Sequence, residues 1–414
     1  MERKSNVERG APLNQPLRIL MIAPTSFFLD YGCHVRILEE ARVLRRLGHR
    51  VTVVTYHLGR DLPDIEVLRS QPPPWRAEYE VGSSLHKVAF DLLLGWRVLT
   101  VVLTRPFDLI HAHLYDGALM GAVIGKLRGL PVIFDRQGSL TGEMVDHRFL
   151  DPTGPWYRWV MLLEERINHM ADRIVTSTQL GAVQLERYCD CETTYVQPLP
   201  DCVDLSFFRP DVLPPEEVLA RRAGLGFASD GPIVVYVGLL ADYQGIPHLL
   251  KAARILEQRG VAARYVIGGF PGEEHYRRMA IELGVGHRVI FTGKVPYNET
   301  PAFLALGDLA VAPKLSETEG SGKILNYMAM ALPTVAFDTP VSREYMGSLG
   351  TYAHPAGDLE ALAGAIQYLI ERPDRRRTLG NQLRQRAERH FSWDRAGRQL
   401  VRVYRDVIQK RRGR

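Results

Sequence analysis

Cysteine is scarce in this chain, and the few cysteines lack the spacing of a metal or redox site. There are 4 in 414 residues, Cys33, Cys189, Cys191 and Cys202. None of their spacings matches a zinc site, and Cys189 and Cys191 are too close together for a CxxC redox motif. We therefore expect no metal site, and the composition is typical of a protein of the reducing cytoplasm.

A long uninterrupted apolar run is also missing. Residues 88–103 are the most apolar stretch, but Asp91 and Arg97 interrupt it and it is too short to span a bilayer. Residues 1–16 are polar and lack the apolar centre of a signal peptide, so we interpret them as a flexible tail. The sequence thus predicts no transmembrane segment and a cytoplasmic location, with attachment to the inner face of a membrane left open.

Signatures of nucleic-acid binding are absent as well. The sequence has no zinc finger, no RNA-binding sheet motif and no basic stripe interleaved with aromatic residues, so we expect no nucleic acid partner. The formal charge is +5, and the chain ends in the basic string QKRRGR. This mild excess favours anionic partners such as nucleotide phosphates or an acidic membrane face.

Two segments of the first half predict strongly apolar helices. In residues 83–103 the larger apolar side chains fall on roughly one face, namely Leu85, Val88, Leu92, Trp96, Leu99 and Leu103. We expect this face to pack on a sheet, and we expect the same of WYRWVMLLEERI at 156–167. The alternative is that the first region, with Lys87, Arg97 and Arg105, touches a membrane that holds a lipid-linked acceptor.

Apolar strands and amphipathic helices alternate along the chain. A strand at 18–24, a helix ending at Gly48 and a strand at 51–56 predict parallel strands joined by a right-handed crossover. After a stretch rich in proline and aspartate, which we interpret as a linker, the pattern restarts at 232–238. We therefore predict an α/β protein with two tandem doubly wound parallel-sheet (Rossmann-like) domains facing a cleft.

The stretch KLSETEGSGKILNYMA, residues 314–329, lies between two apolar strands. Its apolar residues fall at helical spacing, so we expect a helix that begins near Gly322 or Lys323 and ends before Pro333. Glycines let backbone N–H groups approach a ligand, and the amides of a first helical turn carry partial positive charge. The segment therefore predicts a phosphate site, with an ordinary crossover loop as the alternative.

The order of the motifs resembles glycosyltransferase family 4, whose members have the GT-B fold. In the first half the resemblance rests on LGHRVTVVT, FDLIHAH and ADRIVTST, and in the second on VYVGLL, IGGFPGE, IFTGKV and GSGKILNYMA with LPTVAFD. It runs from Arg18 to about Arg405. The resemblance implies an acceptor domain at 17–205, a donor domain at 206–390 and a helix at 391–414 that returns to the first domain.

The resemblance assigns the stretch 314–329 to the diphosphate and ribose of a nucleotide-sugar donor. Lys323 and the amides of Ser321, Gly322 and Lys323 would meet the diphosphate. Asn326 stands where relatives carry a glutamate that hydrogen-bonds the ribose, and an amide can still accept a hydroxyl proton. Glu319, rather than Glu317, would approach the donor sugar.

At several positions the chain departs from the family pattern. Relatives commonly place an arginine after Gly238 and a lysine before the next glycine, both on the diphosphate, whereas this chain has Leu239 and Gln244. Either Lys314 and Lys323 compensate, or donor binding is weakened. Gln137 stands where many relatives have a histidine near the reacting carbon; it cannot titrate but can hold a sugar hydroxyl.

The remaining site residues also follow from the resemblance. Gly32 ends the loop after the first strand, where the diphosphate approaches, and the backbone around Gly293 and Val295 would receive the base. His111 and His113 alternate on a strand and so point to one side. For this pair an acceptor contact and a purely structural role are both open.

Together these features predict a retaining glycosyltransferase of the hexosyltransferase type, without cofactor or metal. It would move a sugar from a nucleotide-diphosphate donor to a hydroxyl of a carbohydrate or lipid-linked acceptor, such as a cell-surface polysaccharide precursor. The alternative is a non-catalytic protein that kept the scaffold and binds a sugar or nucleotide, or acts as a partner subunit. The replacements at Leu239, Gln244, Gln137 and Asn326 motivate that alternative.

Overall fold

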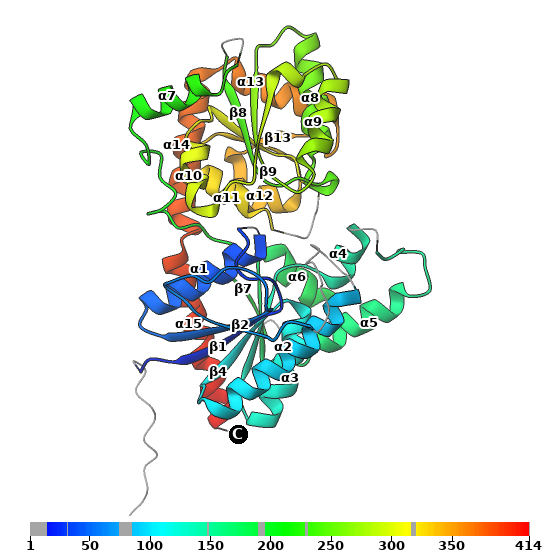
Figure 1. Cartoon of the computed structure of the whole chain (residues 1–414), viewed down its shortest axis with the longest axis vertical. Helices are drawn as coiled ribbons and strands as arrows, with labels where there is room; N and C mark the ends of the chain where they lie inside the picture. Colours follow the sequence, from blue (N-terminus) through cyan, green and yellow to red (C-terminus); the bar gives the residue numbers. More distant parts are fainter. Residues whose placement is uncertain are drawn as a thin grey trace, which may run out of the picture.

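The chain folds into two α/β domains stacked along its long axis (Figure 1). The computed structural model describes residues 15–30, 32–73, 85–146, 149–188, 195–227, 231–315 and 320–413. Each domain is built around one sheet, of 7 strands in the first and 6 in the second, and all paired strands are parallel. The predicted pair of doubly wound parallel-sheet domains is confirmed.

The first sheet has the strand order β3-β2-β1-β4-β5-β6-β7. Helices cover both faces, so its central strands are buried on both sides and are almost entirely apolar, as in RILMIA of β1. The strands are β1 (Arg18–Ala23), β2 (Arg50–Thr55), β3 (Glu66–Arg69), β4 (Leu109–His113), β5 (Val132–Arg136), β6 (Arg173–Thr176) and β7 (Val196–Pro198). The helices are α1 (Gly32–Arg46), α2 (Leu85–Thr104), α3 (Leu114–Arg128), α4 (Leu140–Asp146), α5 (Tyr157–Asn168) and α6 (Gln179–Tyr188).

The second sheet has the order β10-β9-β8-β11-β12-β13. Its strands are β8 (Ile233–Leu239), β9 (Arg264–Phe270), β10 (Val289–Gly293), β11 (Leu309–Ala312), β12 (Thr334–Phe337) and β13 (Thr351–Ala353). Its helices are α7 (Pro215–Gly224), α8 (Ile246–Gln258), α9 (Glu273–Glu282), α10 (Thr300–Leu304), α11 (Gly322–Ala329), α12 (Pro340–Met346), α13 (Leu359–Ile370) and α14 (Pro373–His390). Short 3₁₀ turns are η1 (Asp242–Gln244), η2 (Gly286–Arg288), η3 (Tyr297–Glu299) and η4 (Gly347–Leu349).

Helix α15 (Trp393–Arg412), drawn in red in Figure 1, runs from the second domain along the first and packs against α1. The side chain of Tyr404 is fully buried, and its hydroxyl hydrogen-bonds Nδ1 of His111 on β4. The last described helix therefore completes the core of the domain that begins the chain.

The two domains meet through both apolar and polar side chains. Phe28 of the first domain packs edge-on against Tyr297 of the second, with ring centroids 6.1 Å apart. The carboxylate of Asp30 accepts a hydrogen bond from the Tyr297 backbone N–H at 3.0 Å and lies 3.3 Å from Nζ of Lys294. These contacts hold the carboxyl edges of the two sheets toward each other.

The structure corrects the prediction for the two apolar helices. On α2 the buried residues are Phe90, Leu94, Val98, Val101 and Val102. Val88 and Trp96 of the predicted core face are exposed. Leu92 and Leu103 are exposed as well, and so are most of the large apolar side chains of residues 156–167. Among the described residues, no helix has the length and hydropathy needed to cross a bilayer.

Candidate functional site

The predicted phosphate-binding helix begins where the sequence indicated. Helix α11 starts at Gly322 and follows β11 through a loop that includes Gly320 and Ser321. Its N-cap residue, Ser321, makes no side-chain cap hydrogen bond, and the N–H of Ile324 donates to the Ser321 carbonyl at 2.9 Å. A helix start of this kind is suited to an anion, because the amides of the first turn lie at the positive end of the helix dipole.

Lys323 lies over the end of β8 rather than in bulk solvent. Its ammonium donates to the hydroxyl of Tyr236 at 2.7 Å and to Oε1 of Gln244 at 2.8 Å. The same ammonium lies 4.2 Å from the centre of the Tyr236 ring, within range of a cation–π interaction. The structure thus brings together Lys323 and Gln244, which are 79 residues apart in the sequence.

Gly238 makes this arrangement sterically possible. Its φ of 149° is disfavoured for other residues, and a Cβ atom there would lie 2.9 Å from Nζ of Lys323. Any larger residue would displace the lysine. The glycine of the VYVGLL motif therefore leaves room for a cation at the carboxyl end of β8.

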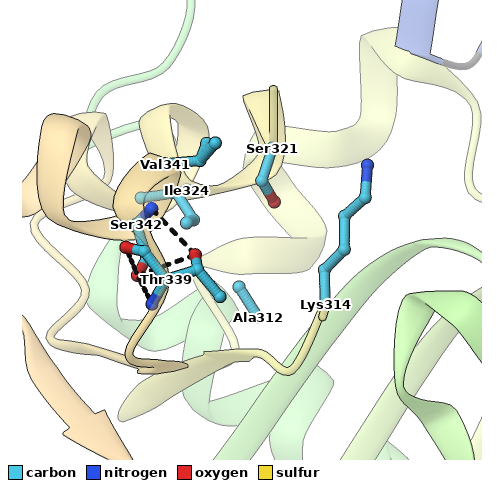
Figure 2. Close-up of a pocket in the computed structure, with 7 residues that line it drawn as sticks. All are labelled: Ala312, Lys314, Ser321, Ile324, Thr339, Val341 and Ser342. Atoms are coloured by element: carbon cyan, nitrogen blue, oxygen red, sulfur yellow. Dashed lines mark hydrogen bonds between the residues drawn. The ribbon is translucent and has the colours of Figure 1, made fainter. Parts of the chain in front are cut away.

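Beside α11 lies a small pocket of about 10 Å³, roughly the space of one water molecule. Figure 2 shows the side chains around it, with Lys314 on one side, Ser321 above and the capping residues Thr339 and Ser342 of α12 opposite. The ammonium of Lys314 is buried and donates to the Gly320 carbonyl at 3.4 Å. Lys314 therefore supports the loop that leads into α11.

The start of α11 lies against the first domain. A Cβ atom on Gly320 would come within 2.5 Å of Oδ2 of Asp201, in the linker between the domains. The same oxygen accepts a hydrogen bond from the Tyr345 hydroxyl at 3.3 Å. One domain further supports the other where the Glu344 carboxylate accepts from the N–H of Gln179, the first residue of α6, at 2.8 Å.

On the side of the first domain, Gln137 follows β5 and is half-buried. Its amide Nε2 donates to Oδ2 of Asp135 at 2.8 Å, and its backbone carbonyl accepts from the Ser177 hydroxyl at 2.9 Å. With the amide nitrogen bound to a carboxylate, the amide oxygen is the group left to face a ligand. Oriented in this way, Gln137 can accept a hydrogen bond from a hydroxyl.

Asp135 belongs to a largely buried ion network centred on Arg36 of α1, in which Asp201 is partly exposed. The guanidinium lies 2.8 Å from Asp135, 2.9 Å from Asp201 and 3.1 Å from Glu40. Burial alone would raise the pKa of Asp135, but Arg36 and His113 hold it well below its ordinary value. Burial and the charge of Asp135 raise the pKa of Glu40 well above its ordinary value. The network therefore favours the neutral form of Glu40 and the ionised form of Asp135.

His111 and His113 lie side by side under this network. Both are fully buried, and their rings stack with centroids 4.4 Å apart. Nδ1 of His113 is 3.0 Å from Asp135, and burial lowers the pKa of His111 well below its ordinary value. The common orientation of the two side chains follows the strand alternation, and their burial favours the structural role over contact with an acceptor.

Four side chains of this cluster could supply ligands to a metal ion. Candidate ligand atoms of Glu40, His111, His113 and Asp135 lie within 4.8 Å of one another. Arg36 already supplies a positive charge at this place, and a bound cation would repel it. We therefore interpret the cluster as a structural ion network, and the expectation of no metal remains a prediction.

A Glu40→Gln variant is expected to be as stable as the wild type at neutral pH, or more stable. An acid whose folded pKa is raised loses stability as pH rises from its unfolded pKa to its folded pKa, because only the unfolded state then ionises. As pH rises through this window, the free energy of unfolding of the wild type should fall relative to that of the variant, by at most about 1.4 kcal/mol per pH unit. Urea unfolding from pH 5 to 8 measures this, with exposed Glu282→Gln as control. A pH-independent loss in Glu40→Gln would instead mean that Glu40 is ionised and bound to Arg36.

The remaining predicted residues lie in varied settings. Gly32 begins α1, and a Cβ atom placed on it would have no described heavy atom within 4 Å, so that side is open. Gly293 ends β10 with φ of 74°, and Val295 packs so closely on Gly268 that a Cβ there would be 2.5 Å away. Asn326 is half-buried on α11. Glu317 and Glu319 lie outside the described residues.

Sequence reasoning missed three residues that position the predicted ones. Tyr236 supports Lys323, and Arg36 with Asp201 links the network under Gln137 to the loop before α11. The available signal was the spacing of Arg36 and Glu40, which are four residues apart on one helix and suited to an ion pair. Tyr236 gave no signal, since an aromatic residue in a buried strand is ordinary.

Family models of glycosyl transferases match both halves of the chain. Residues 31–189 match the model of the glycosyl transferase 4-like domain, and residues 219–386 match that of glycosyl transferases group 1. A D-inositol 3-phosphate glycosyltransferase of Salinispora tropica is 27% identical over 92% of this chain and 82% of its own length. An alpha-D-kanosaminyltransferase of Streptomyces kanamyceticus is 26% identical over 72% of this chain and 77% of its own.

Solved structures show the same fold. Sucrose-phosphate synthase of Thermosynechococcus elongatus superposes with a TM-score of 0.79 at 19% identity, over 95% of this chain and 100% of the other. HepE of Anabaena, solved with UDP and glucose, superposes with a TM-score of 0.74 at 18% identity, over 94% and 99% of the two chains. With both halves matched by family models, the chain belongs to glycosyltransferase family 4 and has the GT-B fold.

Proposed function

We propose that this glycosyltransferase takes its sugar from a nucleotide-diphosphate donor and transfers it, with retention of the anomeric configuration, to a hydroxyl of an acceptor at the first domain. The observation that carries the proposal is the position of Lys323, at the start of α11 and beside the end of β8. An ammonium and the first-turn amides of a helix at one place are suited to a diphosphate whose charge grows as it departs.

Lys323 can take the place of a cation that relatives have and this chain lacks at Gln244. Gln244 stands where relatives commonly carry a lysine, and the ammonium of Lys323 lies 2.8 Å from its side-chain oxygen. The charge of Lys323 is therefore within hydrogen-bond distance of the replaced side chain. This supports compensation by Lys323 rather than loss of donor binding.

Transfer with retention of the anomeric configuration does not require a catalytic base among the protein side chains. The bond from the anomeric carbon to the diphosphate breaks, the acceptor oxygen bonds to that carbon on the same face, and its proton passes to the departing phosphate oxygen. No side-chain base is needed in this scheme, which is consistent with an untitratable Gln137. Gln137 would hold a sugar hydroxyl through its amide oxygen, while Glu319 and Asn326 would contact the donor sugar and the ribose.

The acceptor is proposed at the level of its class. One relative is named for D-inositol 3-phosphate and another for the kanosaminyl group, so the names do not give one common acceptor. For this chain we propose a carbohydrate or lipid-linked acceptor, such as a cell-surface polysaccharide precursor, with the hexosyl group as the unit transferred.

Two measurements on the purified protein test the proposed reaction. Calorimetric titration with UDP, GDP and ADP should find one nucleotide that binds more tightly than the others. Release of that nucleotide from a panel of its sugar derivatives should then proceed, slowly with water and faster with an acceptor extract. Silence with every donor would argue against the proposal, and tight nucleotide binding without turnover would favour the non-catalytic alternative.

A further inference from the structure

Helix α2 has two apolar faces, and only one of them is used by the fold. Phe90, Leu94 and Val98 are buried against the sheet. On the other side Leu92 is 72% exposed and Trp96 is 66% exposed, with Val88 and Leu103 in the same stripe. A surface helix of a soluble protein usually carries polar residues on its outward side. An exposed apolar face of this kind marks a site of interaction with another molecule or a membrane.

The two neighbouring helices continue the apolar surface. Helix α3 packs between α2 and α5, and the three lie next to one another on one side of the first domain (Figure 1). On α3 the exposed residues recur every four positions and so form a stripe, Leu119, Val123 and Leu127. At and after the start of α5, Trp156 is 71% exposed and Trp159 66%, followed by Met161, Leu162 and Leu163. Most exposed large hydrophobic side chains of the described residues belong to this one surface, which we call the α2–α3–α5 face.

The charges on the same helices are mainly basic. The exposed basic side chains are Lys126, Arg128, Arg158 and Arg166, and Arg97 is half-buried. Of the acidic side chains on these helices, Asp91 and Asp116 both pair with Lys87, and Glu164 is buried against Arg136. Glu165 is exposed, so the exposed charges of the face are mainly basic. Apolar side chains with tryptophans, bordered by arginine and lysine, match the interface of an anionic bilayer better than a protein surface.

The face also reaches toward the proposed reaction site. In a parallel sheet a helix that follows a strand starts at the carboxyl edge, and α3 starts at Leu114, directly after β4. Gln137 follows β5 at the same edge, and α4, which starts three residues later, packs on α5, where Thr141 donates to Glu164. An acceptor anchored in a bilayer against this face would therefore stand close to Gln137.

We propose that the α2–α3–α5 face binds the surface of an anionic lipid bilayer and that the enzyme takes an acceptor anchored in that bilayer. The second part rests on the proposed function, whereas binding to the bilayer does not. The apolar stripes would insert among the acyl chains near the head groups, and the arginine and lysine side chains would contact the lipid phosphates.

Vesicle flotation tests the proposal with the whole protein. The wild type should float with vesicles of equal phosphatidylcholine and phosphatidylglycerol, and at least tenfold less with phosphatidylcholine alone. The exposed double variant Trp96→Glu with Trp159→Glu should lose at least tenfold in binding. Leu219→Glu on α7, equally exposed but outside the face, should bind as the wild type does.

Further readouts separate the bilayer from other partners and from the reaction. Brominated lipids should quench tryptophan fluorescence in the wild type and much less in the double variant. The double variant should bind nucleotide as tightly as the wild type does, because the substitutions lie outside the nucleotide site. Flotation is measured without any donor or acceptor, so its result holds even if no sugar transfer is detected. No flotation, or a lipid-free dimer that the double variant abolishes, would overturn the proposal; the latter would assign the face to a second copy of the chain.

Discussion

A Lys323→Ala variant should lose about 100- to 1,000-fold in kcat for sugar transfer, because a preorganised cation no longer meets the charge that develops on the departing diphosphate. Affinity for the nucleoside diphosphate should fall as well, by roughly tenfold or more, since charge-assisted hydrogen bonds to phosphate are worth about 1.5–3 kcal/mol. Initial rates with the preferred donor and calorimetric titration measure the two effects.

The fold should tolerate this change. Lys323 is half-buried and bonds to Tyr236 and Gln244 at the edge of β8, so thermal unfolding should shift little. Lys251→Ala on the exposed side of α8 is the matched control and should keep full activity. Lys323→Arg should recover part of the rate, since it restores the charge but not the position of the ammonium. A loss in Lys323→Ala smaller than about threefold would contradict the role given to this residue.

An Arg36→Met variant should destabilise the first domain by about 3–5 kcal/mol, the range for a buried ion pair that loses one partner. The substitution leaves the carboxyl groups of Asp135, Asp201 and Glu40 without their common cation in a largely buried site. Urea unfolding followed by circular dichroism measures the loss, and Arg45→Met on the exposed end of the same helix is the control.

The pH dependence distinguishes lost charge pairing from lost packing. In the wild type Asp135 has a lowered pKa, so the stability it contributes is present above its unfolded pKa and is lost as pH falls. In Arg36→Met this contribution should disappear, and the variant should approach the wild type in stability toward acid pH. A deficit that stays constant across pH would mean that Arg36 stabilises the domain through packing alone.

The predicted layout succeeded because the signals for it are local. Each strand is a short apolar run next to a helix of clear periodicity, and the start of α11 is marked by Gly322 and Lys323 in sequence. The positions of Tyr236 and Asp201 depend instead on contacts across 87 and 165 residues. Such contacts form only when two elements pack, so no local pattern predicts them.

The error on α2 has a different origin. A spacing of four residues, which is helical, relates Val88, Leu92 and Trp96 in one stripe. The same spacing relates Phe90, Leu94 and Val98 in the other. Periodicity identifies an apolar face but cannot choose between two of them. The choice is made by the sheet, whose surface complements the second stripe, and the first stripe is left outside.

The contact between His111 and Tyr404 joins residues 293 positions apart. A ribosome adding 5–20 residues per second needs roughly 15–60 s to make the chain between them. Throughout that time the nascent first domain lacks α15, and the groove on α1 and β4 that this helix later fills is open. Nascent chains of this protein should therefore depend on chaperones until α15 emerges from the ribosome. The chaperones would then protect a first domain of which most was synthesised long before.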